Sequence, residues 1–427
     1  ANESIEKDWE EATSYDITDD DIERARLLLD VDRPNRVDDW IHTASEDNIR
    51  GFARGYGSDN PLFCDPDYAA GSRWGGVIAP GMMAGVMNKP MLGDSLDPEL
   101  KAKTRSLFKG VHVFVSGAEW EWYRPIYPGD TLYSFQPDDS QEVKDSEFAG
   151  RSVIRVRRDV KVNQRAEVVA VYRSLRVHTG RKKAAKKGKY AGIEPQSYTE
   201  EDIVAIDARY ASEQVRGGAR RFIEDVEVGD ALGDMIKGPL TITDVVMCHM
   251  GGYGYGPYYP GASRLAYQNR QRIPAFYIKN EQGIPDVSQR LHWDAEWAKA
   301  IGNPMAYDYG VMREQNFFHY LSDWCGDDGI VLRTHDEVRK FNYMGDVQYI
   351  TGEVTDKREE QGQPVVDVSV RFINQRDEET FRATATIALP SKDRPLPIYP
   401  EVPAELRERA VKMMSRHCET CFRLQKI

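Results

Sequence analysis

One histidine and one carboxylate lie close enough in the sequence to form a proton-transfer pair. His292 follows Asp286 by six residues. An imidazole with its ordinary pKa of about 6.5 exchanges protons at neutral pH, and a carboxylate does so when burial or a bound water adjusts its pKa. The pair therefore predicts general acid–base chemistry. The alternative is a structural histidine, because a lone histidine beside a tryptophan, here Trp293, is often part of a core.

A second candidate lies downstream, where Tyr309 and Gly310 precede a helix-like stretch. Residues 311–324 carry apolar side chains at helical spacing, and Gly326 is a plausible stop. The N–H groups at a helix N-terminus can stabilise a developing oxyanion, and a glycine lets a substrate approach the backbone closely. Gly310 is therefore a candidate oxyanion site, with a simple packing glycine as the alternative.

The two halves of the chain repeat each other. Phe63 begins a segment of the form x-x-Asp-x-x-aromatic-Ala, and Gly81 follows it by 18 residues; His292 and Gly310 stand in the same relation. Phe63 is thus the counterpart of His292. Two further pairs match downstream: Gly129-Asp130 with Gly345-Asp346, and Asn163-Gln164 with Asn374-Gln375.

The repeat also predicts the fold. Residues 153–162 and 366–373 alternate apolar and polar side chains, as half-buried antiparallel strands do. A sheet needs a covering layer, and one main helix in each half supplies it. We therefore expect an α+β protein of two fused hot-dog domains, each an antiparallel sheet wrapped around one long helix.

These patterns divide the chain into five parts. We expect an N-terminal helical extension (1–35), a first hot-dog domain (36–178), a basic linker (179–215), a second hot-dog domain (216–395) and a C-terminal tail (396–427).

The first half resembles the MaoC-like and R-specific enoyl-CoA hydratase family. Residues 56–65, with Asn60-Pro61-Leu62 at their centre, and residues 75–82 are similar to its signature, Ser-Gly-Asp-x-Asn-Pro-Leu-His-x-Asp followed by Gly-x-Ile-Ala-His-Gly. In that family the Asp and the His five residues later are catalytic. Here Ser58 and Phe63 stand at these two positions. The resemblance thus implies a catalytically silent first half that shapes the acyl-binding tunnel.

The second half keeps the histidine of that signature. His292 matches it, and Asp286 precedes it by six residues rather than five; Ser288 and Arg290 are weaker substitutes for the acid. The resemblance implies that Asp286 and His292 hold one water and add it to an enoyl-CoA, giving an (R)-3-hydroxyacyl-CoA. Tyr309 and Gly310 would then polarise the thioester carbonyl.

Two other functions remain open from the sequence. Hot-dog domains also serve as acyl-CoA thioesterases, and some are non-catalytic acyl-CoA-binding subunits. The substrate expected in each case is an acyl-CoA. The sequence implies no metal or redox cofactor, and a homodimer is expected by analogy. The six lysines and arginines in residues 181–189 predict a solvated linker or a surface for CoA phosphates or an acyl carrier protein.

The composition of the chain limits its partners and its cellular location. The net charge of −12 argues against a nucleic-acid partner, and no apolar run is long enough to span a membrane. Five scattered cysteines and the absence of a leader-like N-terminus predict a cytoplasmic protein.

Three other clusters carry weaker signals. Cys418 and Cys421 after His417 look like half a zinc site, which we set aside for want of a second pair. The neighbours Cys248 and His249 are interpreted as a packed or surface pair on a predicted helix. A Gly- and Tyr-rich segment begins an insertion, residues 252–285, expected as a substrate lid or as a self-packed surface loop.

Overall fold

The computed structural model describes residues 7, 16–94, 96–109, 111–146, 150–180, 192–254 and 259–425. The first half begins with helices α2 (Asp19–Arg26), α3 (Glu46–Gly55), α4 (Pro61–Cys64), α5 (Pro66–Ala70), η1 (Gly81–Val86) and α6 (Pro98–Lys103). Its strands are β1 (His112–Trp122), β2 (Leu132–Phe135), β3 (Asp138–Ser146), β4 (Gly150–Asn163) and β5 (Val168–Thr179).

The second half contains more helical segments. They are α8 (Glu200–Ser212), η3 (Ile223–Asp225), α9 (Ile242–Met250), α10 (Arg264–Arg272), η4 (Pro274–Phe276), η5 (Ser288–His292), α11 (Ala295–Ala300), α12 (Gly310–Cys325) and α13 (Ala404–Leu424). The strands are β6 (Ala231–Lys237), β7 (Tyr277–Lys279), β8 (Pro285–Val287), β9 (Ile330–Val338), β10 (Gln348–Glu360), β11 (Gln363–Asn374) and β12 (Glu379–Ala388).

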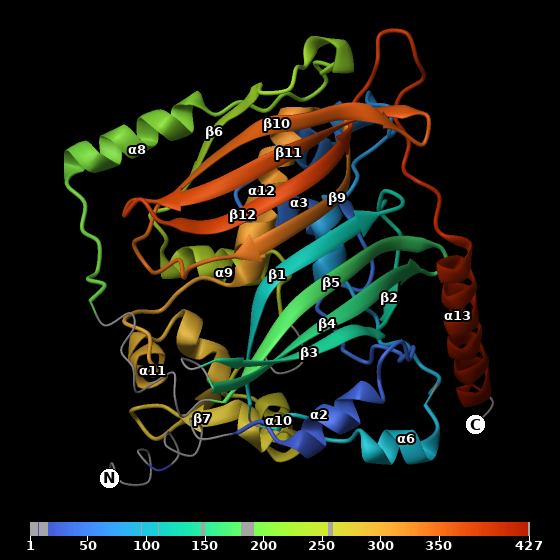
Figure 1. The fold of residues 1–427 in the computed structure, drawn as a ribbon, viewed down its shortest axis with the longest axis vertical. Coiled ribbons are helices and arrows are strands. Elements are labelled where there is room, and N and C mark those ends of the chain that lie inside the picture. The colour runs from blue at the N-terminus through green and yellow to red at the C-terminus, as the bar shows by residue number, and fades with distance from the viewer. Residues whose placement is uncertain are drawn as a thin grey trace.

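Ten strands form one continuous antiparallel sheet (Figure 1). Its order is β2-β4-β5-β1-β9-β12-β11-β10-β6, with β3 paired to β4. The halves meet where β1 pairs with β9, from Gly117 opposite Glu337 to Glu121 opposite Arg333. A Cβ on Gly117 would lie 2.3 Å from the carbonyl oxygen of Asp336, so only glycine permits this approach.

One hydrophobic core runs through both halves. Residues of α12, including Phe317 and Leu321, pack against the inward side chains of β11 and β12, and α3 and η1 contribute to the same cluster. The predicted helix at residues 311–324 is confirmed as α12, and Gly326 ends it with a positive φ of 74°. The predicted α+β architecture of two hot-dog domains is likewise confirmed.

The first half departs from its twin at the central helix. In the position of α12 it has only η1, six residues long. Trp120 and Trp122 stack in parallel, with ring centroids 5.4 Å apart, and lie against η1. A Cβ on Gly81 would stand 2.7 Å from the indole of Trp122, and one on Gly85 would stand 3.3 Å from Trp120. The two indoles thus pack so closely on η1 that Gly81 has no room for a side chain.

The helices α8 and α13 each pack beside one half of the sheet. α8 runs beside β6, and α13, drawn dark red, runs beside the first-half strands (Figure 1). The segment expected as a tail therefore contains a 21-residue helix, whose Met413 and Met414 join a cluster with Met91 and Phe135. The basic run 181–189 lies outside the described residues. No helix among those described is long and apolar enough to cross a membrane.

Candidate active site

His292 is held at the end of η5 with its ring oriented. The side chain is 8% exposed, and its Nδ1 lies 2.8 Å from the carbonyl oxygen of Tyr307. Because a carbonyl only accepts hydrogen bonds, Nδ1 carries the proton in the neutral ring, and Nε2 is the basic nitrogen. The ring lies on that of Tyr309, with centroids 3.8 Å apart. The imidazole is therefore held in one orientation, directly beside the first residues of α12.

Tyr309 connects this imidazole to a second one. Its hydroxyl lies 3.1 Å from Nε2 of His249, on α9. His249 Nδ1 lies 2.8 Å from the carbonyl oxygen of Tyr253, so its Nε2 accepts a hydrogen bond from the tyrosine hydroxyl. Burial lowers the pKa of His249, which keeps it neutral near pH 7. His249, Tyr253, His292, Tyr307 and Tyr309 together form what we call the histidine–tyrosine cluster.

The sequence does not single out His249 as a functional candidate, because Cys248 and His249 are typical of a packed or surface pair. The repeat points instead to the segment that follows α9, which contains Tyr253. The Asp244 carboxylate accepts hydrogen bonds from the backbone N–H and hydroxyl of Thr241 at the start of α9. Ser45 and Asn48 cap α3 in the same spacing. Aligning these two caps places Gly252-Tyr253-Gly254, which follow α9, opposite Tyr56-Gly57-Ser58 of the first half, and places His249 opposite Ala53.

Asp286 lies on β8, where it pairs with Ile278 of β7. Its half-buried carboxylate accepts a hydrogen bond of 2.7 Å from the N–H of Val287. Within the described part of the chain, no hydrogen bond joins Asp286 to His292. The structure thus brings His292, Tyr309 and Gly310 together and leaves Asp286 on the preceding hairpin.

Arg290, one of the weaker substitutes for the acid, holds that hairpin in place. It is 1% exposed, and its guanidinium donates to the carbonyl of Ile278 at 2.9 Å and to the carboxylate of Asp294 at 3.0 Å. It also lies over the ring of Trp297. These contacts fix the turn that presents His292.

A buried ion pair anchors the start of α12. Arg313 donates to both oxygens of Asp308, at 2.9 and 2.8 Å, and to the carbonyls of Lys340 and Thr380. Asp308 immediately precedes Tyr309 and Gly310, so this network fixes the position of the helix N-terminus. A Cβ on Gly310 would meet only Val338, at an ordinary 3.8 Å. Packing therefore does not require glycine there, which favours the close approach of a ligand as its reason.

The equivalent place in the first half is filled. Phe63 and Ser58 are buried, and Trp122 covers the N-terminal end of η1 at Gly81. A cavity of about 50 Å³ remains between Phe63, Trp122 and Phe318. That volume is too small for an acyl-pantetheine arm.

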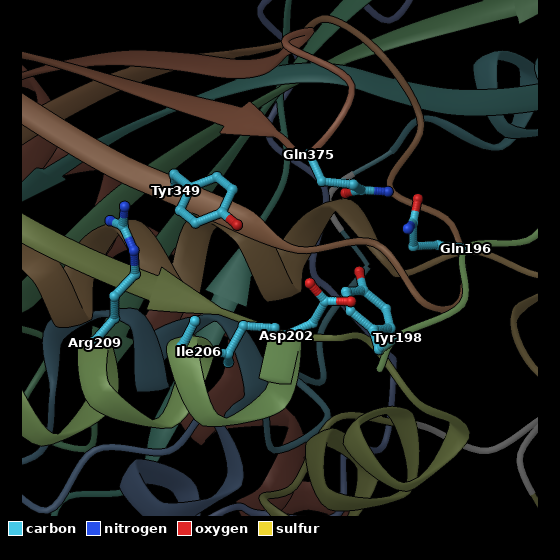
Figure 2. Close-up of a pocket in the computed structure, with 8 residues that line it drawn as sticks. Gln196, Tyr198, Asp202, Ile206, Arg209, Tyr349 and Gln375 are labelled. Atoms are coloured by element: carbon cyan, nitrogen blue, oxygen red, sulfur yellow. The ribbon is translucent and has the colours of Figure 1, made fainter. Parts of the chain in front are cut away.

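A larger pocket of about 220 Å³ lies on the outer side of the second half, between α8 and β10 (Figure 2). Its lining residues are Gln196, Tyr198, Asp202, Ala205, Ile206, Arg209, Tyr349 and Gln375. The guanidinium of Arg209 lies 5.0 Å from the centre of the Tyr349 ring. None of the lining residues belongs to the histidine–tyrosine cluster, so this pocket is not the candidate active site.

Comparisons with known proteins agree with this architecture. Residues 36–171 match the family described as "FAS1-like, dehydratase domain region". No curated protein matches the chain significantly.

Among solved structures, a MaoC-like dehydratase shares 18% identity over 85% of this chain and 100% of its own, with a TM-score of 0.56. A MaoC-like dehydratase from Phytophthora capsici shares 11% identity over 86% of this chain and 99% of its own (TM-score 0.46). A conserved hypothetical protein from Mycobacterium tuberculosis, described as having a double hot-dog fold, shares 12% identity over 84% and 97% (TM-score 0.44). The resemblance to MaoC-like dehydratases expected from the sequence is thus confirmed. Residues 36–171 thus resemble the FAS1-like dehydratase domain region, and the chain as a whole has the double hot-dog fold, which it shares with a MaoC-like dehydratase.

Proposed function

We propose that this protein is a hydro-lyase that adds water reversibly to the double bond of an enoyl-CoA, with its chemistry in the second half. The observation that carries the proposal is the contact of the oriented His292 imidazole with Tyr309 at the N-terminus of α12. One small region thereby combines an imidazole with backbone N–H donors, and addition of water to an enoyl thioester needs both a base and an oxyanion site.

Each group has a task in this mechanism. The N–H groups at Gly310 polarise the thioester carbonyl as negative charge moves onto its oxygen. Nε2 of His292 removes a proton from the water that attacks the β-carbon. A second group then protonates the α-carbon. By family resemblance the product is an (R)-3-hydroxyacyl-CoA.

Two groups are candidates for the second proton transfer. The sequence nominates Asp286, whose carboxylate lies on the hairpin before η5. The geometry favours the Tyr309 hydroxyl, which is hydrogen-bonded to His249, because the ring of Tyr309 contacts that of His292 directly. Asp286→Asn and Tyr309→Phe, compared side by side, identify the donor by which variant loses turnover.

The test of the function is the loss of enoyl-thioester absorbance with a panel of trans-2-enoyl-CoAs. We expect turnover in the wild type and a fall of roughly 10²-fold or more in His292→Gln. His335→Gln is a matched control, since His335 lies half-exposed on β9, outside the histidine–tyrosine cluster. Equal activity of His292→Gln and wild type would refute the assignment.

The same assay separates the competing functions. Release of free CoA without hydration would indicate a thioesterase. Binding of acyl-CoA with no turnover on any chain length would indicate a binding subunit. The cytoplasmic location and the homodimer expected by analogy belong to the same proposal, and the dimer is tested by the mass of the protein in solution.

A further inference from the structure

A hydrogen-bonded chain of three side chains, one half-buried and two buried, lies apart from the histidine–tyrosine cluster. Nζ of Lys237, at the end of β6, lies 2.8 Å from Nδ1 of His319. Nε2 of His319 lies 3.1 Å from Oδ2 of Asp323, one turn further along α12. Nζ also donates a 3.0 Å hydrogen bond to the carbonyl oxygen of Tyr56. We call these three residues the Lys237 relay.

The proton positions in the relay follow from its last member. The carboxylate of Asp323 accepts, so Nε2 of His319 carries the hydrogen, and Nδ1 presents its lone pair to Lys237. An activated nucleophile is usually hydrogen-bonded to a base, and a third group orients that base. Lys237, His319 and Asp323 have this arrangement. Oδ1 of Asp323 is buried and has no hydrogen-bond partner among the residues described. The carboxylate thus commits one oxygen to orienting the imidazole.

Burial supports this reactivity. It lowers the pKa of Lys237 to about 8, against the opposing charges of Glu213, Asp323, Asp244 and Asp59. It also lowers the pKa of His319, with Lys237 acting in the same direction. A sizeable neutral fraction of the amine is therefore present at mildly alkaline pH, beside an imidazole that can accept a proton.

The amine lies beside an exposed residue, Gly57. Lys237 is half-buried, whereas His319 and Asp323 are buried. Nζ lies over the loop that follows α3, where a Cβ placed on Gly57 would be 3.4 Å away. Gly57, with a φ of 86°, leaves no side chain over Nζ on that side.

We propose that Lys237 is an acyl-acceptor site, modified on its side-chain amine by acyl thioesters. The neutral Nζ attacks the thioester carbonyl carbon, forming a C–N bond. His319 takes a proton from the attacking nitrogen, the C–S bond breaks, and the thiolate leaves and receives that proton. The products are an amide on Lys237 and a free thiol, with no change in oxidation state.

The test uses two thioesters, acetyl-CoA and the smaller uncharged S-acetyl-N-acetylcysteamine. The full-length protein is incubated with each at pH 8, and peptide mass spectrometry follows acylation of every lysine with time. Lys299, which is 56% exposed and paired with Glu296, is the internal reference. We expect Lys237 to acylate roughly tenfold or more faster than Lys299 with at least the uncharged thioester. A Lys237 rate equal to or below that of Lys299 with both thioesters overturns the proposal.

Variants then test the relay itself. His319→Gln and Asp323→Asn should bring the Lys237 rate down to that of Lys299, while Lys299→Arg leaves it unchanged. Persistence of fast Lys237 acylation in both relay variants contradicts the role of His319. If either variant does not fold, the acylation rates of Lys237 and Lys299 in the wild-type protein still test the proposal. Hydration is read separately at His292, so either activity can fail without the other.

Discussion

The indole Nε1 of Trp120 donates a hydrogen bond of 3.1 Å to Oε2 of Glu314. The contact joins β1 of the first half to α12 of the second. Glu314 is 3% exposed, and burial raises its pKa to about 7. The neighbouring buried carboxyl of Asp336 is shifted in the same direction by burial and by Glu314. The junction between the halves therefore contains carboxyl groups that hold protons near neutral pH.

This arrangement makes stability depend on pH. The folded pKa of Glu314 lies above that of an unfolded glutamate, about 4.3. The stabilising contribution of the protonated form is complete below the unfolded pKa and is lost as the pH rises through about 7. We expect Glu314→Gln to gain stability over wild type between pH 5 and pH 8, by about 1.4 kcal/mol per unit of pKa difference. Urea unfolding at both pH values measures this.

A control separates this effect from general titration. Glu359 is 54% exposed and pairs with Arg394 on the surface. Glu359→Gln should track the wild type at both pH values. A parallel response of the two glutamine variants would refute a special role for Glu314.

Tyr309→Phe removes one hydroxyl and keeps the ring on His292. We expect turnover to fall by roughly tenfold or more with little change in KM, because proton transfer is lost while the binding surface stays. His249→Gln should act through the same hydroxyl, so the double variant should be no slower than the slower single variant. Steady-state hydration kinetics check this, and fully additive losses would show that the two residues act separately.

Two glycines at equivalent positions should respond in opposite ways to alanine. Gly81→Ala places a methyl 2.7 Å from the indole of Trp122 and should cost about 1–3 kcal/mol of stability, with hydration affected only through folding. Gly310→Ala has room beside Val338 and should leave stability within about 1 kcal/mol, yet lose hydration because the methyl stands where the thioester must approach. Thermal unfolding and the hydration assay distinguish the two, and full activity in Gly310→Ala would exclude that approach.

The Asp308–Arg313 pair should be costly to break. Both side chains are nearly fully buried, so Asp308→Ala leaves a buried guanidinium without its counter-charge and should cost about 3–5 kcal/mol. Lys299→Ala, which breaks an exposed pair with Glu296, should cost less than about 1 kcal/mol. Similar losses in the two variants, measured by urea unfolding, would contradict this account.

The sequence predicts the parts of the site that lie within the repeat. Matching Phe63 to His292 and Gly81 to Gly310 requires only spacing, and α12 follows from its apolar period and the stop at Gly326. Tertiary contacts bring in the functional candidates that the sequence does not single out. His249 reaches Tyr309 from another helix across 60 residues of sequence, and no local pattern encodes such a contact.

Asp286 shows a second limit. Its spacing from His292 suggests a loop carboxylate displaced by one residue from the acid position of the family signature. The structure instead inserts α10 and the β7–β8 hairpin after α9, so sequence distance no longer measures proximity to the acid position of the family. The Lys237 relay cannot be predicted from sequence spacing either, because its residues lie on β6 and α12, which come into contact only in the folded protein.

The pairing of β1 with β9 has a consequence for how the two copies can change over time. β9 ends at Val338, the residue that faces Gly310, and its other neighbour is β12. A substitution that displaces β1 would therefore move a wall of the candidate site in the opposite copy. Under the proposed function, selection on the second copy would then also act on the first, although Ser58 and Phe63 stand where the family signature has its acid and histidine.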